Sequence, residues 1–596
     1  MVIDSSRTPQ SILLACSLIL ILSALYLAAN RSLSSTLEGE SAEIAREFLE
    51  GPSLIVNHLN GQEDLDKPAL YYWVIALVSK IAPSWELAAR LPSIVSIFLI
   101  ALAIYLIQAP TDPPMFFPLT CFIMAASPKV LLMSQTARMD MLFTAACFGA
   151  MVGFYLYWEK AQEKIEDVGS PISFFILAAG AVMLKGPVGA ILTFCPVVVF
   201  LCINRKWRMV KRVFLSKGIV VFLALILPWY LAATLETDFR FFHRFILEEN
   251  LSRFTSLIPG GAYKDFSHHP INRYFIYFLV GFFPWSMIWP FWVYDVIRNW
   301  KKKDGRIRLF FIYFAFVFIF FTLAISKRSD YILPLYPAGA LITALYALER
   351  PKSWQMEVPF ITFFGLLFIA GISLSLLAVL LLSKGTSTLP HFLSKLKELE
   401  TFSYFLSEYP FLPRVLVLLT VVSFFGLISK WVPRNRGWGI NRLSLFSILM
   451  TFSIALLVSV LLTTLYGEKD PRRFCNQVAQ LAKDSPLYYY DFWDEECTFY
   501  LHRRIYTLYG KKKLMETISR EDKAFFIIRE RDLLKLDQEG VFFSFVFRKD
   551  SPRLRPLVLV SRNAARGKEI IHRIEDHAVV ENGHLRPIAL PSSPIQ

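Results

Sequence analysis

The chain has 596 residues, of which 55% are hydrophobic, 15% aromatic and only 19% charged. This composition is too apolar for a soluble protein and indicates a polytopic membrane protein. The formal net charge of +15 could suggest nucleic-acid binding, but the basic residues gather in short loops between apolar stretches. We therefore attribute the positive charge to membrane topology.

The first predicted element is an apolar segment at 10–29, which has the length that a bilayer demands. One arginine precedes it and no cleavage-type polar region follows it, so we expect a retained anchor rather than a signal peptide. A polar loop follows at 38–73, with eight carboxylates, two cations and a Tyr-Tyr-Trp run. Such a loop could hold a base and an anion anchor. It could equally be a solvated amphipathic helix that joins two spans, with Glu43, Arg46, Glu47 and Glu50 on its exposed face.

About thirteen membrane crossings are predicted, several of them at the short end of the ~17–25 residues that a span requires. The apolar segment at 69–83 is short and aromatic, so we expect an interfacial helix there. The remaining predicted spans are 91–108, 115–133, 141–158, 171–185, 188–204, 214–234, 273–296, 308–325, 331–349, 356–383, 411–429 and 443–466.

Three clusters of basic residues set the predicted orientation. They are Arg205, Lys206, Arg208, Lys211 and Arg212; Lys301, Lys302, Lys303, Arg306 and Arg308; and Lys430, Arg434, Arg436 and Arg442. Short basic loops mark the cytoplasmic side. Alternating the spans from a cytoplasmic N-terminus places all three clusters inside, and places the 30–90 and 234–272 loops and everything after 466 outside.

From 467 the composition changes to short apolar-aromatic runs separated by charged segments. PLYYYDF, AFFIIRE, VFFSFVF and PLVLVS read as strands, while ECTFYLHRRIY and KKKLMETI read as helices. We therefore predict a small extramembrane α/β domain at 467–596. Its two cysteines, Cys475 and Cys497, could pair if the domain lies outside the cytoplasm.

The predicted topology brings a set of ionisable residues to the outer ends of the spans, where such residues tend to mark a pathway or a site. Acids could abstract a proton, and several cations could hold a phosphate group. Each also has a simpler explanation: a local ion pair, a snorkelling cation or a loop histidine. The set comprises Glu38, Glu40 and Lys67 in the first loop, Arg138 and Asp140 in SQTARMDM, Lys185 in LKGP, Glu249 and Arg253 in EENLSRF, His268 and His269 in KDFSHHP, and Lys327, Arg328 and Tyr331 in SKRSDYILPLYP.

These motifs, in this order over about 1–350, resemble the GT-C family 39 glycosyltransferases. That group contains the protein O-mannosyltransferases and the bacterial aminoarabinose transferase of lipid A. The resemblance rests on the stretches GESAEIAREFLEG, LNGQEDLDKPALYYW, ELAARLPS, ARMDM, LKGPVG, ENLSRF, FFPWS and SKRSDYILPLYP. The thirteen crossings and the terminal α/β domain resemble the lipid A branch in particular.

The resemblance implies roles for particular residues. An acid of the first loop is the expected base for the acceptor, and the acid at Asp140 is also functional. The lysine of the Lys-Pro pair, here Lys67, helps to hold the carrier phosphate. The family often has Asp-Glu, followed by an arginine two residues on, whereas this chain has Leu37-Glu38-Gly39-Glu40. Only Glu38 of that pair remains, so either Glu38 or Asp140 could be the base.

Some relatives hold a divalent ion between the acid beside this lysine and a histidine of the long loop. The matching residues here are Asp66 and His268 or His269. The sequence establishes no cofactor, and the resemblance leaves a divalent metal ion as an open alternative.

We therefore expect an α-helical membrane protein of GT-C type in the bacterial inner membrane, with a catalytic domain at 1–466 and a periplasmic domain at 467–596. The expected activity is sugar transfer from an undecaprenyl-phosphate-linked donor to an envelope acceptor such as lipid A. Lys67, Arg138, Lys185, Lys327, Arg328 and Tyr331 are expected to bind the carrier phosphate, and Glu40, Glu249 and Arg253 the acceptor. The alternatives are a protein O-mannosyltransferase-like enzyme, a lipid or solute transporter, and a sensor whose terminal domain binds a ligand.

Overall fold

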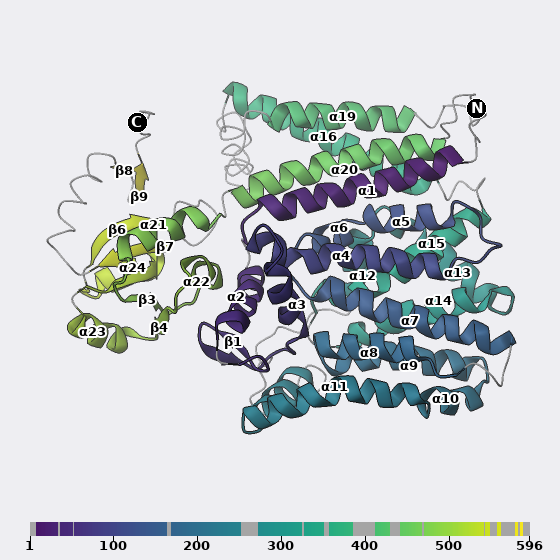
Figure 1. Ribbon diagram of the computed structural model, residues 1–596. Helices are drawn as coiled ribbons and strands as arrows, with labels where there is room; N and C mark the ends of the chain where they lie inside the picture. Colours follow the sequence, from purple (N-terminus) through teal and green to yellow (C-terminus); the bar gives the residue numbers. More distant parts are fainter. Residues whose placement is uncertain are drawn as a thin grey trace. The chain divides into compact units, whose positions relative to one another are not determined.

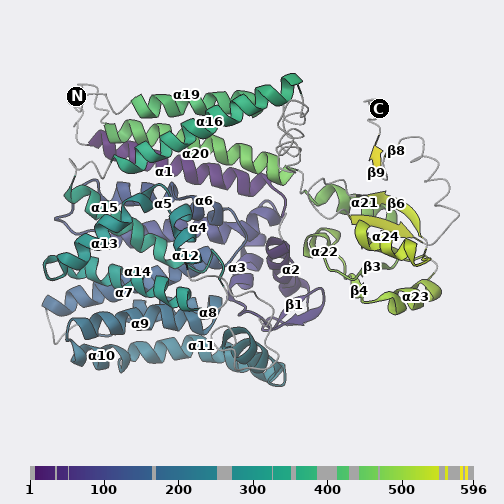
Figure 2. The same ribbon diagram turned by 180° about the vertical axis from the view of Figure 1, so that it is seen from behind.

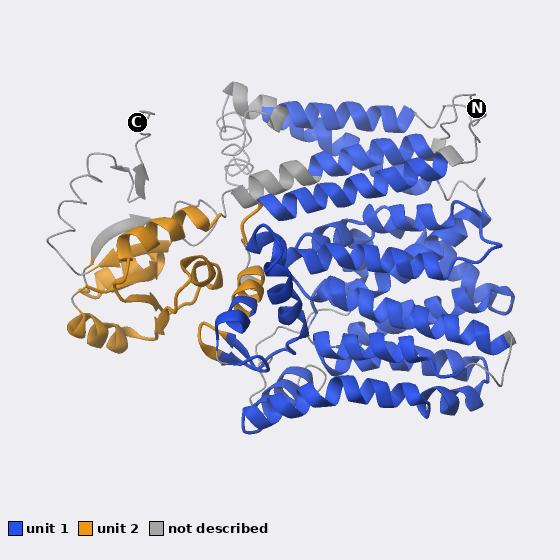
Figure 3. Ribbon diagram, viewed as in Figure 1, with its two compact units in different colours: residues 1–30, 45–58, 63–464 blue, residues 31–44, 59–62, 465–596 orange. Residues whose placement is uncertain are grey.

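The computed structural model describes the chain in two compact units (Figure 3). Unit 1 comprises residues 1–30, 45–58 and 63–464, and unit 2 comprises residues 31–44, 59–62 and 465–596. The residues described are 7–33, 36–51, 53–163, 169–251, 272–324, 327–350, 357–384, 412–428, 442–467, 470–521, 523–541, 543–548, 557–561, 578–581 and 584–587.

Unit 1 is built from apolar helices. Those with the length and composition of membrane spans are α1 (Arg7–Asn30), α4 (Trp85–Leu106), α7 (Asp140–Glu163), α11 (Lys217–Glu236), α14 (Gly305–Leu323) and α16 (Val358–Lys384). Further apolar helices are α8 (Ile172–Lys185), α9 (Pro187–Ile203), α19 (Leu412–Ile428) and α20 (Arg442–Gly467). Figures 1 and 2 show α7, α8, α9 and α11 side by side. The chain is therefore a multi-pass membrane protein.

Two predicted spans are broken in the structure. The segment 115–133 forms α5 (Phe116–Ala125) and α6 (Pro128–Ser134), which are bent by 72°. The segment 273–296 forms α12 (Arg273–Gly281), a short 3₁₀ turn and α13 (Trp289–Arg298). Both breaks contain prolines, Pro128, Pro284 and Pro290, which lack the amide hydrogen that a continuous helix needs. Among the described residues six helices, or seven if the bent pair counts as one span, could cross a membrane by length and composition; the count of thirteen stays a prediction.

The first polar loop is folded. It contains α2 (Thr36–Glu50), the hairpin β1 (Asn57–Leu59) and β2 (Gln62–Asp64), and α3 (Leu70–Ser79). At ten residues, α3 is about 15 Å long, half of a hydrocarbon core, as expected for an interfacial helix. The boundary between the units passes through α2 and through the hairpin.

In unit 2, five strands form one mixed sheet in the order β4-β3-β5-β7-β6. β3 (Leu487–Tyr490) is parallel to β4 (Tyr506–Leu508) and β5 (Phe525–Arg529), while β7 (Leu557–Ser561) is antiparallel to β5 and β6 (Ser544–Arg548). The helices are α21 (Arg472–Ala482), α22 (Glu495–Leu501), α23 (Lys511–Arg520) and α24 (Glu530–Gln538), and β8 (Ala578–Glu581) pairs with β9 (His584–Pro587). The four predicted strands and both predicted helices are present, and ECTFYLHRRIY also contains β4.

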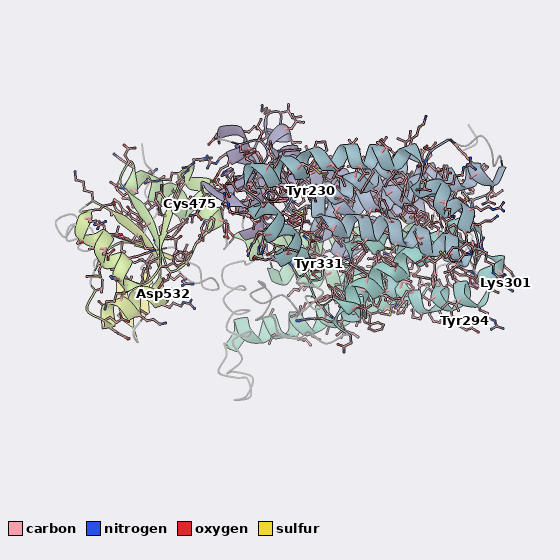
Figure 4. The ribbon with its side chains drawn as sticks, turned by 90° about the horizontal axis from the view of Figure 1, so that it is seen from below. Tyr230, Tyr294, Lys301, Tyr331, Cys475 and Asp532 are labelled. Atoms are coloured by element: carbon pink, nitrogen blue, oxygen red, sulfur yellow. The ribbon has the colours of Figure 1, made fainter. Side chains whose placement is uncertain are left out.

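The two ends of the helical bundle in unit 1 differ in their residues. Figure 4 shows Tyr230 and Tyr331 at one end, and Tyr294 and Lys301 at the other. The Lys301 end carries the second basic cluster of the sequence. The candidate site lies at the Tyr331 end.

Candidate functional site

Asp140 lies between two cations at the start of α7. Its Oδ1 accepts a hydrogen bond from the Lys185 ammonium at 2.5 Å, and its Oδ2 lies 3.2 Å from Nε of Arg138. The residue is only 3% exposed. A buried carboxylate needs such partners, and its place in the first helical turn also favours its negative charge.

Asp330 is a second buried acid, 6% exposed, and it shares Arg138 with Asp140. Its Oδ2 lies 2.7 Å from the Arg138 guanidinium, and its Oδ1 lies 2.5 Å from the Lys129 ammonium. Burial and the nearby Asp140 charge raise the pKa of Asp330, but Arg138 and Lys129 outweigh them and hold it below its ordinary value. Burial lowers the pKa of Arg138, but Asp140 and Asp330 raise it by more, so the pKa of Arg138 lies above its ordinary value.

We call these residues the charged cluster: Lys129, Arg138, Asp140, Lys185, Arg328 and Asp330. Four cations and two acids leave it with two positive charges in excess. The ring of Tyr331 lies 5.1 Å from the Lys185 ammonium, as does the ring of Phe143. The cluster is therefore a partly buried cationic site with aromatic walls, which suits an anionic group.

Lys327 and Arg328 differ in their environments. Lys327 is buried and donates to the carbonyl oxygens of Thr322 and Ala324, so it caps the C-terminal end of α14. Burial lowers the pKa of Lys327. The side chain of Arg328 is 44% exposed, and its guanidinium lies 3.7 Å from Asp330. Of the two, only Arg328 is joined to the charged cluster by an ion pair that the structure shows.

The first loop contributes a separate set of contacts in unit 1. The backbone carbonyl of Lys67 accepts a hydrogen bond from Asn57, and Asp66 accepts one from Arg244 at 3.0 Å. Arg244 belongs to a π-helix, η1 (Phe242–Leu251), and also pairs with Glu248 and, at 3.7 Å, with Glu249. A cavity of about 470 Å³ lies here, lined by Glu63, Asp64, Leu65, Asp66, Arg240, His243 and Arg244.

The π-helix is packed onto the turn that carries Lys185. Gly186 follows Lys185 with φ +78°, and a Cβ at this glycine would lie 2.5 Å from the ring of Phe245. Any side chain at this position would both strain the backbone and displace the ring. The LKGP motif therefore places η1 beside the charged cluster.

Three predicted site residues, Arg253, His268 and His269, lie outside the described residues. Of the predicted metal ligands the structure describes Asp66, whose carboxylate pairs with Arg244. No group of three or more histidine, cysteine or acidic side chains that could hold a metal ion is found in the part of the chain that the structure describes. The predicted metal site therefore stays a prediction, and we derive no step through a metal.

Glu38 and Glu40 belong to unit 2. Glu38 is 1% exposed and pairs with Arg31, whose guanidinium lies 3.2 Å from Oε1. Gly39 approaches the backbone of Glu496 so closely that a Cβ would lie 2.9 Å from its nitrogen. The start of α2 is thus tightly packed against α22.

The sequence predictions included Arg138, Asp140, Lys185 and Arg328 but omitted Lys129 and Asp330. Asp330 lies inside SKRSDYILPLYP, a motif used for its cations only. Lys129 lies inside the predicted span 115–133, and an ionisable residue within an apolar span is itself a signal of function. That signal could have identified Lys129.

An apolar groove runs along α7, with a volume of about 360 Å³. Three of its lining residues, Leu70, Leu142 and Leu184, lie close in sequence to Lys67, Asp140 and Lys185. Along α7 the lining continues to Leu156. Between Leu142 and Leu156 the helix rises by about 21 Å. The groove is long and apolar enough for a hydrocarbon chain.

Comparisons with known proteins place these features in a family context. Residues 66–231 match the family model described as dolichyl-phosphate-mannose-protein mannosyltransferase. That range contains Lys67, Arg138, Asp140 and Lys185. Over these residues the chain is similar to that mannosyltransferase family.

Curated relatives include an undecaprenyl phosphate-alpha-4-amino-4-deoxy-L-arabinose arabinosyl transferase of Yersinia enterocolitica, 28% identical over 328 residues, covering 54% of this chain and 56% of the relative. A second, from Proteus mirabilis, is 27% identical over 361 residues, covering 58% and 61%. The alignments thus span less than two thirds of these relatives.

A solved structure shares the fold. The crystal structure of ArnT from Cupriavidus metallidurans bound to undecaprenyl phosphate aligns with a TM-score of 0.70 at 19% identity, covering 93% of this chain and 98% of that one. The predicted fold class, a helical membrane protein of GT-C type, is thereby confirmed, and the α/β fold of the terminal domain is consistent with the alignment.

Proposed function

We propose that the protein transfers a sugar from a polyprenyl-phosphate carrier to an envelope acceptor such as lipid A, at the periplasmic face of the inner membrane. The observation that carries this proposal is the charged cluster, with two positive charges in excess, at the end of the bundle where the apolar groove begins. An anionic head and a hydrocarbon tail are the two parts of a polyprenyl-phosphate donor.

The excess charge also suits the chemistry of the step. The acceptor oxygen would attack the anomeric carbon, the bond from that carbon to the phosphate oxygen would break, and the configuration would invert. The carrier changes from a phosphodiester with one negative charge to a phosphomonoester with up to two. Because negative charge develops in the transition state, preorganised cations stabilise it more than they stabilise the bound donor.

We assign the carrier phosphate to Arg138, Lys185 and Arg328, with Tyr331 beside Lys185. Lys67 is assigned to the same role through the family pattern. Lys327 contributes a nearby positive charge while it caps α14. Since ion pairs with Asp140 and Asp330 fix Arg138 and Lys185, the phosphate would meet cations already oriented.

Removal of the acceptor proton requires a carboxylate that acts as a general base, and two candidates remain. Asp140 contacts two cations of the cluster and would orient them or take the proton. Glu38 is the first-loop alternative. Glu40, Glu249 and Arg253 are proposed to contact the acceptor.

A protein hydroxyl group is the alternative acceptor, because the matching family model describes a protein mannosyltransferase. A deletion strain and its parent should be compared by mass spectrometry of lipid A and of envelope glycoproteins. Loss of a sugar from lipid A, restored by the wild-type gene and not by Asp140→Asn, is the expected result. A sugar lost only from proteins favours the alternative, and unchanged lipid A and glycoproteins would contradict both.

A further inference from the structure

Residues 59–62 of the β1–β2 hairpin, which include its tip, belong to unit 2, whereas 57–58 and 63–64 belong to unit 1. The tip is Asn60-Gly61, with φ of +55° and +74°. Two residues with positive φ form the tightest hairpin connection, for which Asn-Gly is the preferred pair. The turn is therefore encoded locally and presents the Asn60 side chain at its apex.

Asn60 makes a reciprocal pair of hydrogen bonds with the backbone of Ile505. Its Nδ2 donates to the Ile505 carbonyl oxygen at 2.7 Å, and the Ile505 amide donates to its Oδ1 at 3.0 Å. The Asn60 side-chain amide thus makes the two hydrogen bonds to Ile505, just before β4, that the backbone of a paired strand would make. Ile505 is fully buried in the core of unit 2, together with Tyr489 and Cys497. The hairpin tip is therefore attached to a rigid part of the C-terminal sheet domain.

Three further contacts attach the first loop to the same region. The Leu33 amide donates to the Tyr500 hydroxyl at 2.8 Å. Gly39 packs on the backbone of Glu496, and a Cβ at Gly61 would lie 2.5 Å from Nε of Arg504. Contacts at two separate segments, 31–44 and 59–62, fix both the start of α2 and the tip of the hairpin.

We propose that the C-terminal unit positions the first polar loop, and that Asn60 is the principal positioning residue. Asp66 and Lys67 follow β2 directly, so the hairpin that Asn60 holds sets where the Lys67 side chain can reach. This inference rests on the proposed function for its consequence, which is tighter binding of the donor phosphate. The physical attachment can be tested without it.

The test is Asn60→Gly in the full-length protein. Glycine keeps the positive φ of the turn and removes both hydrogen bonds to Ile505. Gln62→Ala is the matched control, because Gln62 is exposed on β2 of the same hairpin. Hydrogen exchange of peptides that contain Ile505 and residues 62–67 should be roughly tenfold faster in Asn60→Gly and unchanged in the control.

Kinetics give a readout that a purely structural role would not move. For sugar transfer from a polyprenyl-phosphate donor, Asn60→Gly should raise the donor KM by roughly tenfold, with kcat within about twofold of wild type. Unchanged exchange of 62–67 in Asn60→Gly, or faster exchange with an unchanged KM, would overturn the proposal. If the wild-type protein transfers no sugar, the proposed function fails, and the exchange of residues 62–67 alone decides whether Asn60 positions the loop.

Discussion

At the scale of residues, Asp140 and Asp112 form a natural comparison, because both are buried acids paired with arginine. Asp140 lies in the charged cluster, with Asp330 just beyond the C-terminal end of α14. Asp112 pairs with Arg306 at 2.6 Å, near the N-terminal end of the same helix. We propose a functional role only for the first pair.

Replacing each acid separates these roles. Asp140→Asn should lower the rate of sugar transfer by roughly 10²–10⁴-fold, whether Asp140 takes the proton or orients Arg138 and Lys185. Asp112→Asn should instead destabilise the fold by about 3 kcal/mol, because the buried Arg306 then keeps only the more distant, half-exposed Asp304 as an ion-pair partner, while the folded fraction keeps its turnover. Rates per folded molecule and thermal unfolding of both variants provide the check; equal turnover in the two variants would contradict the assignment.

Glu38 requires its own variant, since the sequence left the base open between two acids. Glu38→Gln keeps the shape of the side chain and removes the charge that pairs with Arg31. If Glu38 takes the acceptor proton, kcat should fall by roughly 10²–10⁴-fold with little change in the donor KM. A kcat close to that of wild type would leave Asp140 as the proposed base.

Glu495 of unit 2 has a raised pKa. Its burial, and then the charges of Asp494 and Glu40, raise the pKa of Glu495 from 4.5 to about 7, against a lowering by its own backbone amide. The folded state therefore binds this proton more tightly than the unfolded state. The contribution of this proton to the free energy of unfolding is fully present below pH 4.5 and is progressively lost as the pH rises through about 7.

The loss should be on the order of 3 kcal/mol at pH 8, at 1.36 kcal/mol for each unit of pKa. Glu495→Gln should remove it, so that β3 and β5 amides in the full-length variant exchange more slowly than in wild type at pH 8 and equally at pH 4. Wild-type exchange protection that does not fall between these pH values would contradict this account.

The sequence singled out four of the six residues of the charged cluster, for a physical reason. Arg138, Asp140 and Lys185 lie at the ends of spans, where hydropathy changes sharply. Asp330 lies in such a place too, but its partner Lys129 lies 201 positions away and inside a predicted span. Only the bend between α5 and α6 shows where Lys129 lies in the fold.

At the scale of elements, α7 and α8 supply two residues of the charged cluster, Asp140 and Lys185, and part of the lining of the apolar groove. Gly180 of α8 lines the groove, and a Cβ there would meet nothing within 4 Å. Gly365 of α16 is equally open but does not line the groove. Because an added Cβ meets no neighbour at either glycine, matched substitutions at Gly180 and Gly365 test the role of the groove.

Gly180→Leu should fill the groove and raise the KM for a long-chain polyprenyl-phosphate donor by roughly tenfold. The matched Gly365→Leu should leave the KM unchanged, since leucine favours a helix more than glycine does. A KM unaffected by Gly180→Leu would remove the groove from the carrier site while leaving the charged cluster in place.

Hydropathy predicted most helices of unit 1 and its interfacial helix α3, because each of them is a continuous run of mostly apolar residues. It failed at 115–133 and 273–296, since an averaged hydropathy does not register the amide that Pro128 or Pro284 lacks. The strands of unit 2 were predictable from their short aromatic runs. The grouping of 31–44 and 59–62 with them was not, because it depends on contacts such as Asn60 with Ile505.

At the scale of the whole molecule, the orientation in the membrane remains a prediction that the two cysteines of unit 2 can test. Cys475 and Cys497 are fully buried thiols, 3.1 Å apart. A periplasmic domain should contain them as a disulfide, and a cytoplasmic one as thiols. A non-reducing peptide map of protein taken from cells, with free thiols blocked at lysis, provides the readout; two free thiols would contradict the periplasmic placement.

The central claim is that the charged cluster binds the carrier phosphate and promotes its departure. The most direct measurement is the release of polyprenyl phosphate by the purified full-length protein, supplied with a polyprenyl-phosphate aminoarabinose donor and lipid A. We predict acceptor-dependent release by the wild-type protein, with at least a hundredfold slower release by Asp140→Asn and Lys185→Ala. Equal release by wild type and both variants, or none by folded wild type with this donor and with other polyprenyl-phosphate sugars, would contradict the account.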